Sequence, residues 1–185
     1  MAPPRLRAAG PDDAERVALL HADSWRLHYR GAYSDLFLDG DVVADRRSVW
    51  SSRLSAPAHS MTVLAEDDAG PAGFVHVVFD DDDRWGSLVD NLHVAHDRQR
   101  TGIGAALLAR TARAVAERAA APSVYLWVLE QNTGAQDFYR ALGGACVEKT
   151  AVPPPGGVRD RLNGSPLKLR FAWPDASALA RTPGR

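Results

Sequence analysis

Residues Asn91 to Leu108 read Asn-Leu-His-Val-Ala-His-Asp-Arg-Gln-Arg-Thr-Gly-Ile-Gly-Ala-Ala-Leu-Leu. The apolar stretch that ends at Val94 predicts a strand, and the alanine- and leucine-rich stretch that begins at Gly102 predicts a helix. The polar turn between them leaves backbone N–H groups without partners at the start of that helix. Together with the positive end of the helix dipole, those donors form an anion site. We therefore expect a pyrophosphate-sized ligand to rest on the start of this helix.

The glycines and arginines of this turn favour the same ligand. Gly102 and Gly104 have no side chain to keep a bulky phosphate away from the backbone, and Arg98 and Arg100 bring positive charge beside it. Two other phosphate-binding patterns do not match. The dinucleotide-binding pattern needs a third glycine where Leu107 stands, and the P-loop needs a Gly-Lys-Ser/Thr run that the turn lacks. The alternative is a tight strand-to-helix turn that binds no ligand.

A second block of sequence, about thirty residues further on, accompanies the glycine turn. The turn itself, Gln-x-x-Gly-x-Gly at residues 99–104, resembles the acetyl-CoA-binding signature of the GNAT superfamily of N-acetyltransferases. The second block resembles that family's strand followed by Asn-x-x-Ala-x-x-Phe-Tyr and a glycine pair. It consists of Leu126, Trp127, Val128, Leu129, Asn132, Ala135, Phe138, Tyr139, Gly143 and Gly144. Two motifs in the right order are far more specific than either one, and together they cover about residues 88–147.

The resemblance implies an α/β (α+β) fold with a single GNAT-like domain. Its central sheet is expected to be mixed and mostly antiparallel, with about seven strands, about four flanking helices and a splayed pair of parallel strands at the centre. The chain's own pattern agrees, because a strand, a helix and a strand at 85–94, 102–120 and 124–129 imply a parallel pairing with a right-handed crossover. We place the domain at residues 1–173 and expect a disordered tail at 174–185.

Periodicity and turn residues place the other elements. Helices are expected at residues 14–29, then over a stretch to about Leu54 that is interrupted near Gly40, and at 133–142. Strands are expected at residues 6–8, 61–66, 72–79, 145–150 and 167–173. A proline-rich segment that begins at Val152 starts a long loop that reaches Pro166, and loops of this length are often functional.

Length and composition exclude several classes of protein. The 185 residues are 45% hydrophobic with a net charge of −1, which suits one globular domain and gives no basis for a nucleic-acid partner. No apolar run reaches the length of a membrane span, and the N-terminus lacks a signal-peptide core, so we expect a cytoplasmic protein without membrane partners. The single cysteine, Cys146, is expected in the core. The acidic run Asp80–Asp83 is interpreted as a solvated turn, and no metal is expected.

The resemblance also implies which residues bind the acetyl donor, acetyl-CoA. The glycine turn would hold the pyrophosphate of coenzyme A, and the strand before it would pair with the pantetheine arm like an extra strand. A backbone N–H near Val94 would polarise the thioester carbonyl, in the manner of an oxyanion hole. The residues implied are Leu92, His93, Val94, Gln99, Arg100, Thr101, Gly102, Ile103, Gly104, Ala105, Asn132 and Tyr139.

The resemblance assigns the catalytic residues less completely than the residues that bind acetyl-CoA. Tyr139 matches the family's tyrosine and is the candidate general acid that protonates the leaving thiolate, while its neighbour Phe138 is expected in the core. Some family members carry a glutamate as general base where this chain has Trp127, and tryptophan cannot accept a proton. His93 has a suitable unperturbed pKa and is a weak candidate for the base. The alternatives for the general base are a chain of water molecules or one of three polar residues: Asp90, Asn91 and Glu130.

Aromatic residues suggest where the acceptor binds. Residues Trp25, Tyr29 and Tyr33 cluster at the end of the first helix, and with Trp127 and Asn91 they would form a pocket. An aromatic pocket suits an apolar or cationic acceptor. The alternative for these aromatic side chains is simple core packing.

We therefore expect an acetyl-CoA-dependent N-acetyltransferase that acts on a primary amine of a small molecule or peptide, by direct attack within a ternary complex. The alternative is a sensor module of the same fold that binds acyl-CoA without transferring the acyl group. Proteins that resemble this one commonly form dimers, so a homodimer is one expected assembly.

Overall fold

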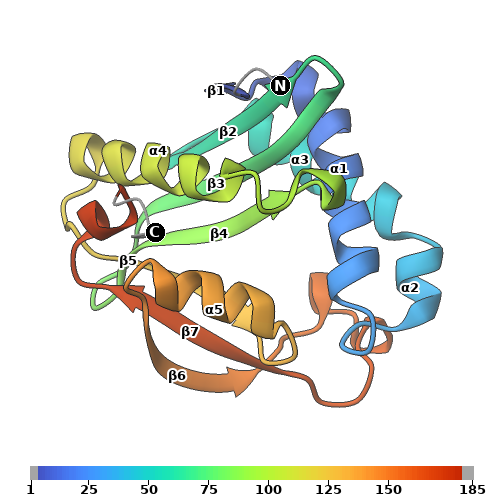
Figure 1. The fold of residues 1–185 in the computed structure, drawn as a ribbon. Coiled ribbons are helices and arrows are strands. Elements are labelled where there is room, and N and C mark those ends of the chain that lie inside the picture. The colour runs from blue at the N-terminus through green and yellow to red at the C-terminus, as the bar shows by residue number, and fades with distance from the viewer. Residues whose placement is uncertain (1–3, 181–185) are drawn as a thin grey trace.

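The computed structural model describes residues 4–180, and a single sheet runs through that range. Its strands, in chain order, are β1 (Arg5–Ala8), β2 (Ser60–Asp67), β3 (Gly70–Asp82), β4 (Gly86–Val94), β5 (Val124–Leu129), β6 (Ala145–Ala151) and β7 (Leu167–Trp173). Within the described residues these seven strands lie in the order β1-β2-β3-β4-β5-β7-β6 (Figure 1). Neighbours are antiparallel except for β4 and β5, which are parallel. The predicted mixed, mostly antiparallel sheet is confirmed.

The helices lie on both faces of this sheet. They are α1 (Ala14–His28), α2 (Asp35–Asp39), α3 (Val42–Ser55), α4 (Ile103–Arg118) and α5 (Thr133–Ala141). The interruption expected near Gly40 is the break between α2 and α3. Ser34 starts α2 by accepting a hydrogen bond from the Phe37 backbone N–H, as a serine N-cap does. Over residues 4–180 the α-helices therefore number five rather than about four.

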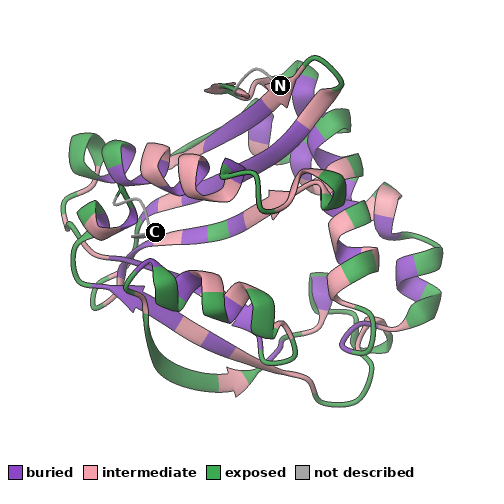
Figure 2. Ribbon diagram, in the orientation of Figure 1, coloured by how far each residue is buried: buried purple, intermediate pink, exposed green. Residues whose placement is uncertain are grey.

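Strand alternation divides the apolar residues of β2 and β3 between the two faces. Val63 and Val75 belong to the cluster that contains Leu107 and Leu108 of α4. The intervening residues, such as Phe74, instead pack with α1 and α3 on the opposite face. Figure 2 shows the corresponding bands of buried residues along these strands. The sheet is thus covered on both faces where it leads into β4.

The central feature is the separation of β4 from β5. These strands pair only from Ser87↔Val124 to Val89↔Leu126, and no pairing follows within the described chain. At the same point β4 contains a bulge. Val89 pairs with β3 residue Val77 and Asn91 pairs with the adjacent residue His76, so Asp90 has no paired residue on β3. A bulge bends its strand and redirects the residues that follow. The expected splayed pair of parallel strands is therefore present, and Figure 1 shows the two halves of the sheet separating toward α1.

The C-terminal end differs from the expected tail. Residues Ala176–Ala180 form a short 3-10 helix whose side chains Ala176 and Leu179 are buried in the core cluster that contains α4. The Ala176 N–H donates to the Pro122 carbonyl at 2.8 Å. The expectation of disorder is wrong for residues 174–180, because apolar side chains at 176 and 179 cover the end of the core. Residues 181–185 lie outside the described residues.

The structure corrects the expectation that Cys146 lies in the core. Cys146 is exposed rather than in the core, because it lies on the edge strand β6, whose residues are almost all exposed (Figure 2).

The acidic run Asp80–Asp83 contributes hydrogen bonds to the fold. Asp80 accepts hydrogen bonds from the Ala120 and Ala121 N–H groups, and Asp82 accepts from the N–H groups that follow it. These carboxylates hold the ends of strands and helices together.

The long loop after β6 is anchored rather than free. It contains short 3-10 turns at Pro155–Gly157 and Arg159–Arg161, and Arg161 Nη1 donates to Asp45 Oδ1 of α3 at 2.6 Å.

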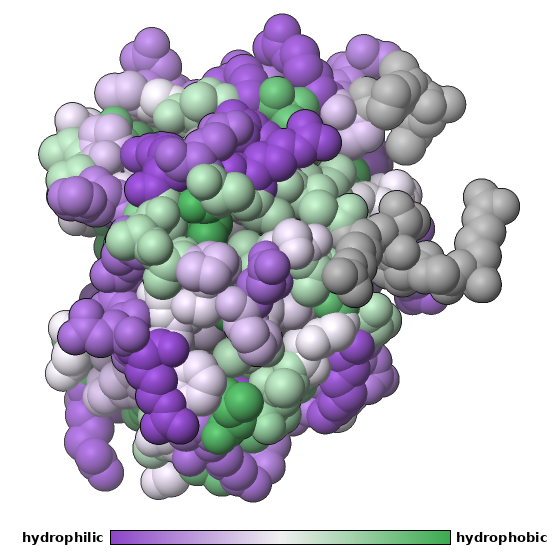
Figure 3. Space-filling model, turned by 90° about the vertical axis from the view of Figure 1, so that its left-hand side faces the viewer, coloured by the Kyte–Doolittle hydropathy of each residue, from purple (hydrophilic) through white to green (hydrophobic). Residues whose placement is uncertain are grey.

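The surface seen in Figure 3 has hydrophilic residues at its top and bottom and moderately hydrophobic residues between them. Among residues 4–180, no helix combines the length and the hydropathy that a membrane span requires.

Replacing Leu179 with alanine tests whether the C-terminal helix belongs to the core. Leu179 is 1% exposed, so Leu179→Ala should lower the free energy of unfolding by about 2–5 kcal/mol. The control is Leu36→Ala, since Leu36 is 87% exposed and its loss should change stability by about 0.5 kcal/mol or less. Urea unfolding of both variants makes the comparison. Equal, small effects would show that this end of the chain does not stabilise the core.

Candidate functional site

A cavity of about 380 Å³ lies where β4 and β5 diverge. Its wall runs from the glycine turn, along β4 and β5, to the first two turns of α5, and α1 contributes one side. Among the residues proposed from the sequence, those that line this cavity are Tyr29, Asp90, Asn91, Leu92, His93, Val94, Arg98, Gln99, Arg100, Gly102, Ile103, Gly104, Ala105, Trp127, Asn132 and Tyr139. The splay of the strands has therefore brought together segments that are up to about a hundred residues apart. Thr101 does not line the cavity, and its hydroxyl donates to the Arg98 carbonyl at 2.6 Å.

The glycine turn presents free backbone donors to this cavity. Gly102 is the N-cap of α4 with a φ of +89°, and no side chain caps the helix. The first helical hydrogen bond is donated by the Ala106 N–H to the Gly102 carbonyl at 3.0 Å, so the N–H groups of residues 103–105 precede it and have no intrahelical acceptor. A side chain at Gly102 would require a strained backbone. Glycine is therefore needed there for the shape of the turn.

Gly104 lies where the start of α4 packs against neighbouring elements. A methyl group at this position would lie 3.4 Å from Phe138 Cζ and 3.8 Å from Val94 Cγ2. The start of α4 thus lies against α5 and the end of β4. Phe138, expected in the core, is partly exposed and lines the cavity at this contact.

The arginines of the turn differ in their pairing. Arg98 is neutralised, since its Nε lies 2.6 Å from Asp67 Oδ2 and its Nη1 lies 2.5 Å from Asp97 Oδ2. It ties the turn to the β2–β3 hairpin instead of adding free charge, which corrects the role expected for it. Arg100 is exposed and borders the cavity. The Gln99 side chain lies 3.2 Å from His28 Nε2 and so joins the turn to α1.

The open edge of β4 carries backbone groups that face the cavity. The Ala95 N–H donates to the Ala72 carbonyl on β3 at 2.9 Å. Along an antiparallel strand the hydrogen-bonding groups of successive residues point to opposite edges, so Val94 and Leu92 direct theirs away from β3. That edge is the one from which β5 has separated. An extended ligand can therefore pair with β4 here as an additional strand would.

Tyr139 reaches the cavity from α5. Asn132 starts this helix by accepting a hydrogen bond from the Ala135 N–H at 3.2 Å. Two turns after Asn132, the ring of Tyr139 packs against Phe171 and Trp173 of β7, and the residue is 7% exposed. Burial raises the pKa of Tyr139 well above its usual value of 10, so the phenol keeps its proton at neutral pH. A neutral hydroxyl at this position can donate to an atom in the cavity.

His93 lies on β4 with its ring against α1. His93 Nδ1 and Ser24 Oγ are hydrogen bonded at 2.7 Å, and the ring lies 4.5 Å from that of His21. Enclosure by protein lowers the pKa of His93 to about 3. The ring is therefore neutral at pH 7, and its low basicity makes it a weak acceptor for the proton of an amine.

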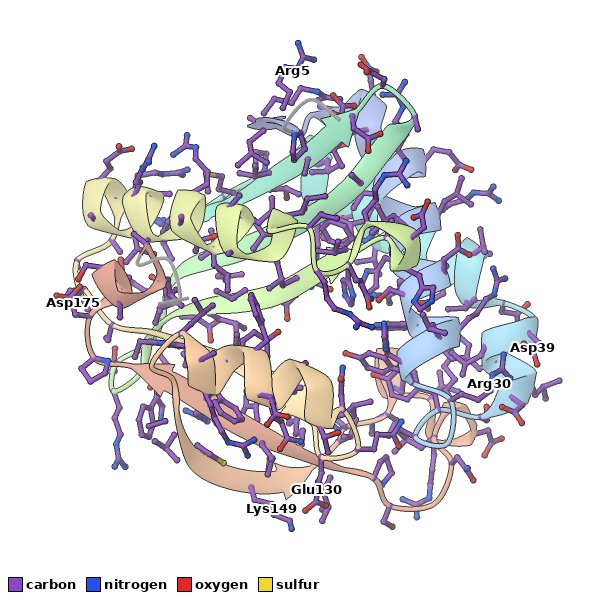
Figure 4. The ribbon with its side chains drawn as sticks, in the orientation of Figure 1. Arg5, Arg30, Asp39, Glu130, Lys149 and Asp175 are labelled. Carbon is purple, nitrogen blue, oxygen red and sulfur yellow. The ribbon has the colours of Figure 1, made fainter. Side chains whose placement is uncertain are left out.

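The acidic candidates are separated by the fold. Glu130 pairs with Lys149 at the surface, away from the β4–β5 cavity (Figure 4). Asp90, at the bulge, lines the cavity, and its carboxylate lies 2.6 Å from Arg53 Nη1 and accepts a hydrogen bond from the Asn91 amide at 2.7 Å. Asp90 is thus the carboxylate at the point where the two strands part.

A second cavity of about 220 Å³ adjoins the first. Both are lined by Tyr29, Asp90, Asn91, Trp127, Val128 and Leu129. Trp25 and Tyr33 line only the second of the two cavities. The predicted aromatic cluster therefore faces a pocket. The rings are also packed together, with Trp25 at 5.0 Å from Tyr33 and 5.4 Å from Tyr29.

Cationic side chains that were not expected from the sequence also line the second cavity. The Arg46 guanidinium lies 4.1 Å from the centre of the Trp25 ring, and Lys168 Nζ lies 4.3 Å from that of Trp127. Arg53 completes the set. Each tryptophan ring thus already lies beside one of the protein's own cations, and repulsion between like charges opposes a cationic acceptor there. One signal was available, because charged residues at 168 and 170 alternate with apolar ones in β7.

Comparison with known proteins agrees with this geometry. A family model described as "Acetyltransferase (GNAT) family" matches residues 20–143. The chain is 27% identical to "Uncharacterized N-acetyltransferase YuaI" of Bacillus subtilis, over 94% of this chain and 95% of the relative. It is 32% identical to "Probable N-acetyltransferase Rv2775" of Mycobacterium tuberculosis, over 73% of this chain and 76% of the relative. The crystal structure of the PaiA N-acetyltransferase from Thermoplasma acidophilum in complex with coenzyme A superposes with a TM-score of 0.71, at 18% identity, over 94% of this chain and all of that one.

The enclosed histidines predict a pH-dependent stability. Burial lowers the pKa of His21, that of His76 to about 4 and that of His93 to about 3. In the unfolded chain histidines titrate near pH 6.5, so from there down to about pH 4 the unfolded state binds more protons. The free energy of unfolding should therefore decrease as the pH falls from 7 to 5, by up to about 1.4 kcal/mol per pH unit for each histidine.

Urea unfolding between pH 7.5 and 5 measures this dependence. The variant His93→Gln removes one of the titrating rings and should make the decrease with falling pH smaller. An unchanged pH dependence in the variant would mean that His93 is protonated as readily in the folded state as in the unfolded state.

Proposed function

Because the chain belongs to the GNAT acetyltransferase family and is an acyltransferase, we propose that it transfers an acetyl group from acetyl-CoA to a primary amine of a small molecule or peptide. The amine attacks directly, within a ternary complex. The observation that carries the proposal is the β4–β5 cavity, which joins an uncapped helix N-terminus, an open strand edge and the hydroxyl of Tyr139, and which meets a second cavity at Trp127.

The donor fits the first cavity by its chemistry. The free N–H groups of residues 103–105 suit the pyrophosphate of coenzyme A, since a helix N-terminus stabilises negative charge. The pantetheine arm carries amides, which can pair with the exposed groups of Leu92 and Val94 as a strand would. This arrangement directs the thioester toward Tyr139 and the second cavity. Asn132 is held by its capping hydrogen bond and lines the same wall.

Three groups of this chain would assist the transfer. The Val94 N–H donates to the thioester oxygen, on which negative charge grows as the amine nitrogen bonds to the carbonyl carbon. Tyr139 gives its proton to the sulfur when the carbon–sulfur bond breaks. The proton lost by the amine passes to Asp90, directly or through water, because Asp90 is the carboxylate that lines both cavities. The transfer needs no covalent acetyl-enzyme.

Coenzyme binding at the helix N-terminus can be tested at Ala105, the third residue of α4. In Ala105→Asp the new carboxylate competes for the free N–H groups and repels phosphate, while the helix dipole favours it and the fold is retained. Acetyl-CoA at 100 times its Kd should stabilise the wild type by about 2.7 kcal/mol, and this gain should be lost in the variant. Thermal unfolding with and without acetyl-CoA measures both.

The control is Ala105→Asn, which has nearly the same size without the charge. It should retain more of the stabilisation by acetyl-CoA than Ala105→Asp does. If wild-type protein is not stabilised at millimolar acetyl-CoA, or if the two variants behave alike because neither loses binding, the pyrophosphate does not lie on this helix.

The role of Tyr139 is tested by Tyr139→Phe. Loss of the hydroxyl should lower kcat by about 100- to 10,000-fold, the range for a general acid, and should leave the stabilisation by acetyl-CoA unchanged because the ring remains. Tyr125→Phe is the matched control, since the Tyr125 hydroxyl donates to Asp81 outside both cavities. Steady-state release of free coenzyme A with a panel of amines gives the rates. Stabilisation by acetyl-CoA without turnover of any amine would favour the sensor alternative instead.

A further inference from the structure

The second cavity has an excess of positive charge. Among the described residues that line it, the cations are Arg46, Arg53 and Lys168, and the single carboxylate is Asp90. Two guanidiniums also share one carboxylate behind the wall, because Asp45 pairs with both Arg46 at 2.5 Å and Arg161 at 2.6 Å. A cavity lined mainly by one sign of charge attracts a ligand of the opposite sign.

Lys168 is the least compensated of these cations. It extends from β7 over the Trp127 ring, and within residues 4–180 no carboxylate forms an ion pair with its ammonium group. Its neighbour Arg170 is paired with Glu148 at 3.0 Å and lies over the same ring. Partial burial lowers the pKa of Lys168, which is the expected response of a cation that lacks a partner. An anion bound beside it would restore the favourable charge pairing.

Arg53 brings a second cation to the same place. Its Nη1 lies 2.6 Å from Asp90 Oδ2, so an ion pair holds this guanidinium at the wall of the cavity. A guanidinium has five N–H donors. A ligand oxygen in the cavity can accept a hydrogen bond from one that Asp90 does not use.

Size and connection limit what the ligand can be. The volume of about 220 Å³ is below the roughly 300–1,000 Å³ of pockets for drug-sized ligands. The cavity meets the proposed acetyl-transfer site at Asn91 and Trp127. A small molecule with its amine at that junction has its other end among Arg53 and Lys168.

We propose that the acceptor is a small amine that also carries an anionic group, a carboxylate in the simplest form, and that Lys168 and Arg53 bind this group. The inference rests on the proposed acetyl transfer and names the substrate class of that site. An amino-acid-like molecule has this chemistry. The amine must be deprotonated to react, whereas the carboxylate remains charged and fixes the orientation of the molecule in the cavity.

Matched pairs of acceptors test the charge requirement. We would measure kcat/KM at saturating acetyl-CoA for α-amino acids and for their α-carboxamides, which keep the side chain and lose the charge. Hydrogen bonds to charged groups correspond to a preference of about 10- to 100-fold for the acids. The carboxamides have the less basic amines, so more of each is neutral at a given pH, and a preference for the acids would arise in spite of that difference.

Lys168 variants assign this preference to the residue. Lys168→Met should lower kcat/KM for the acids by about 10- to 100-fold, mainly through KM, and leave the carboxamides unchanged. Lys168→Arg should retain much of the preference. The chain has one other lysine, Lys149, which is exposed and paired with Glu130 (Figure 4). Lys149→Met is therefore the matched control and should behave as the wild type does.

The outcomes separate this inference from the proposed function. If neutral amines or peptide N-termini are acetylated as well as or better than the acids, the charge requirement is wrong and acetyl transfer stands. If Lys168→Met lowers the rates with acids and carboxamides equally, Lys168 supports Trp127 and does not bind the acceptor. If acetyl-CoA neither stabilises the protein nor is consumed with any amine, the proposed function fails and the inference fails with it.

Discussion

The loss of pairing between β4 and β5 is the constraint on which the rest of the site depends. Pairing stops at Val89 and Leu126, next to the bulge at Asp90. Had the strands continued side by side, the backbone groups of Leu92 and Val94 would be satisfied by β5 and closed to any ligand. Their separation converts the middle of a sheet into two open edges. Both cavities lie along those edges.

Packing on either side holds this separation in place. On one side α4 covers β2 and β3, and its uncapped N-terminus ends at the cavity. On the other side α1 and α3 pack on β2 and β3 through Trp50, which is fully buried and donates its ring N–H to His21. The His93 ring is fixed by Ser24 of α1. The polar edge of β4 is thus supported by a rigid core on both faces, which preorganises the donors that face the cavity.

Charge distinguishes the two cavities. In the first, backbone N–H groups and the exposed Arg100 supply the donors, and Arg98 is already neutralised by two aspartates. In the second, side chains supply the charge, with Arg46 and Lys168 stacked on Trp25 and Trp127. Stacking holds long cationic side chains in one orientation, so the charges in the second cavity are presented in a defined geometry. This division agrees with a donor recognised through its backbone-like amides and phosphates, and an acceptor recognised through its charge.

The sequence alone determined the family-like order of strands and helices, the glycine turn and the positions of Asn132 and Tyr139 in their motif. These features are local: a turn at positive φ needs Gly102, and a helix start needs Asn132, whatever the rest of the chain does. Only the tertiary structure decided the second cavity, the enclosure of His93, the exposure of Cys146 and the packing of Leu179. Each of these depends on which distant segments meet, such as Lys168 of β7 over Trp127 of β5. Burial and charge pairing are properties of such contacts between distant residues, so periodicity and motif spacing along the chain do not encode them.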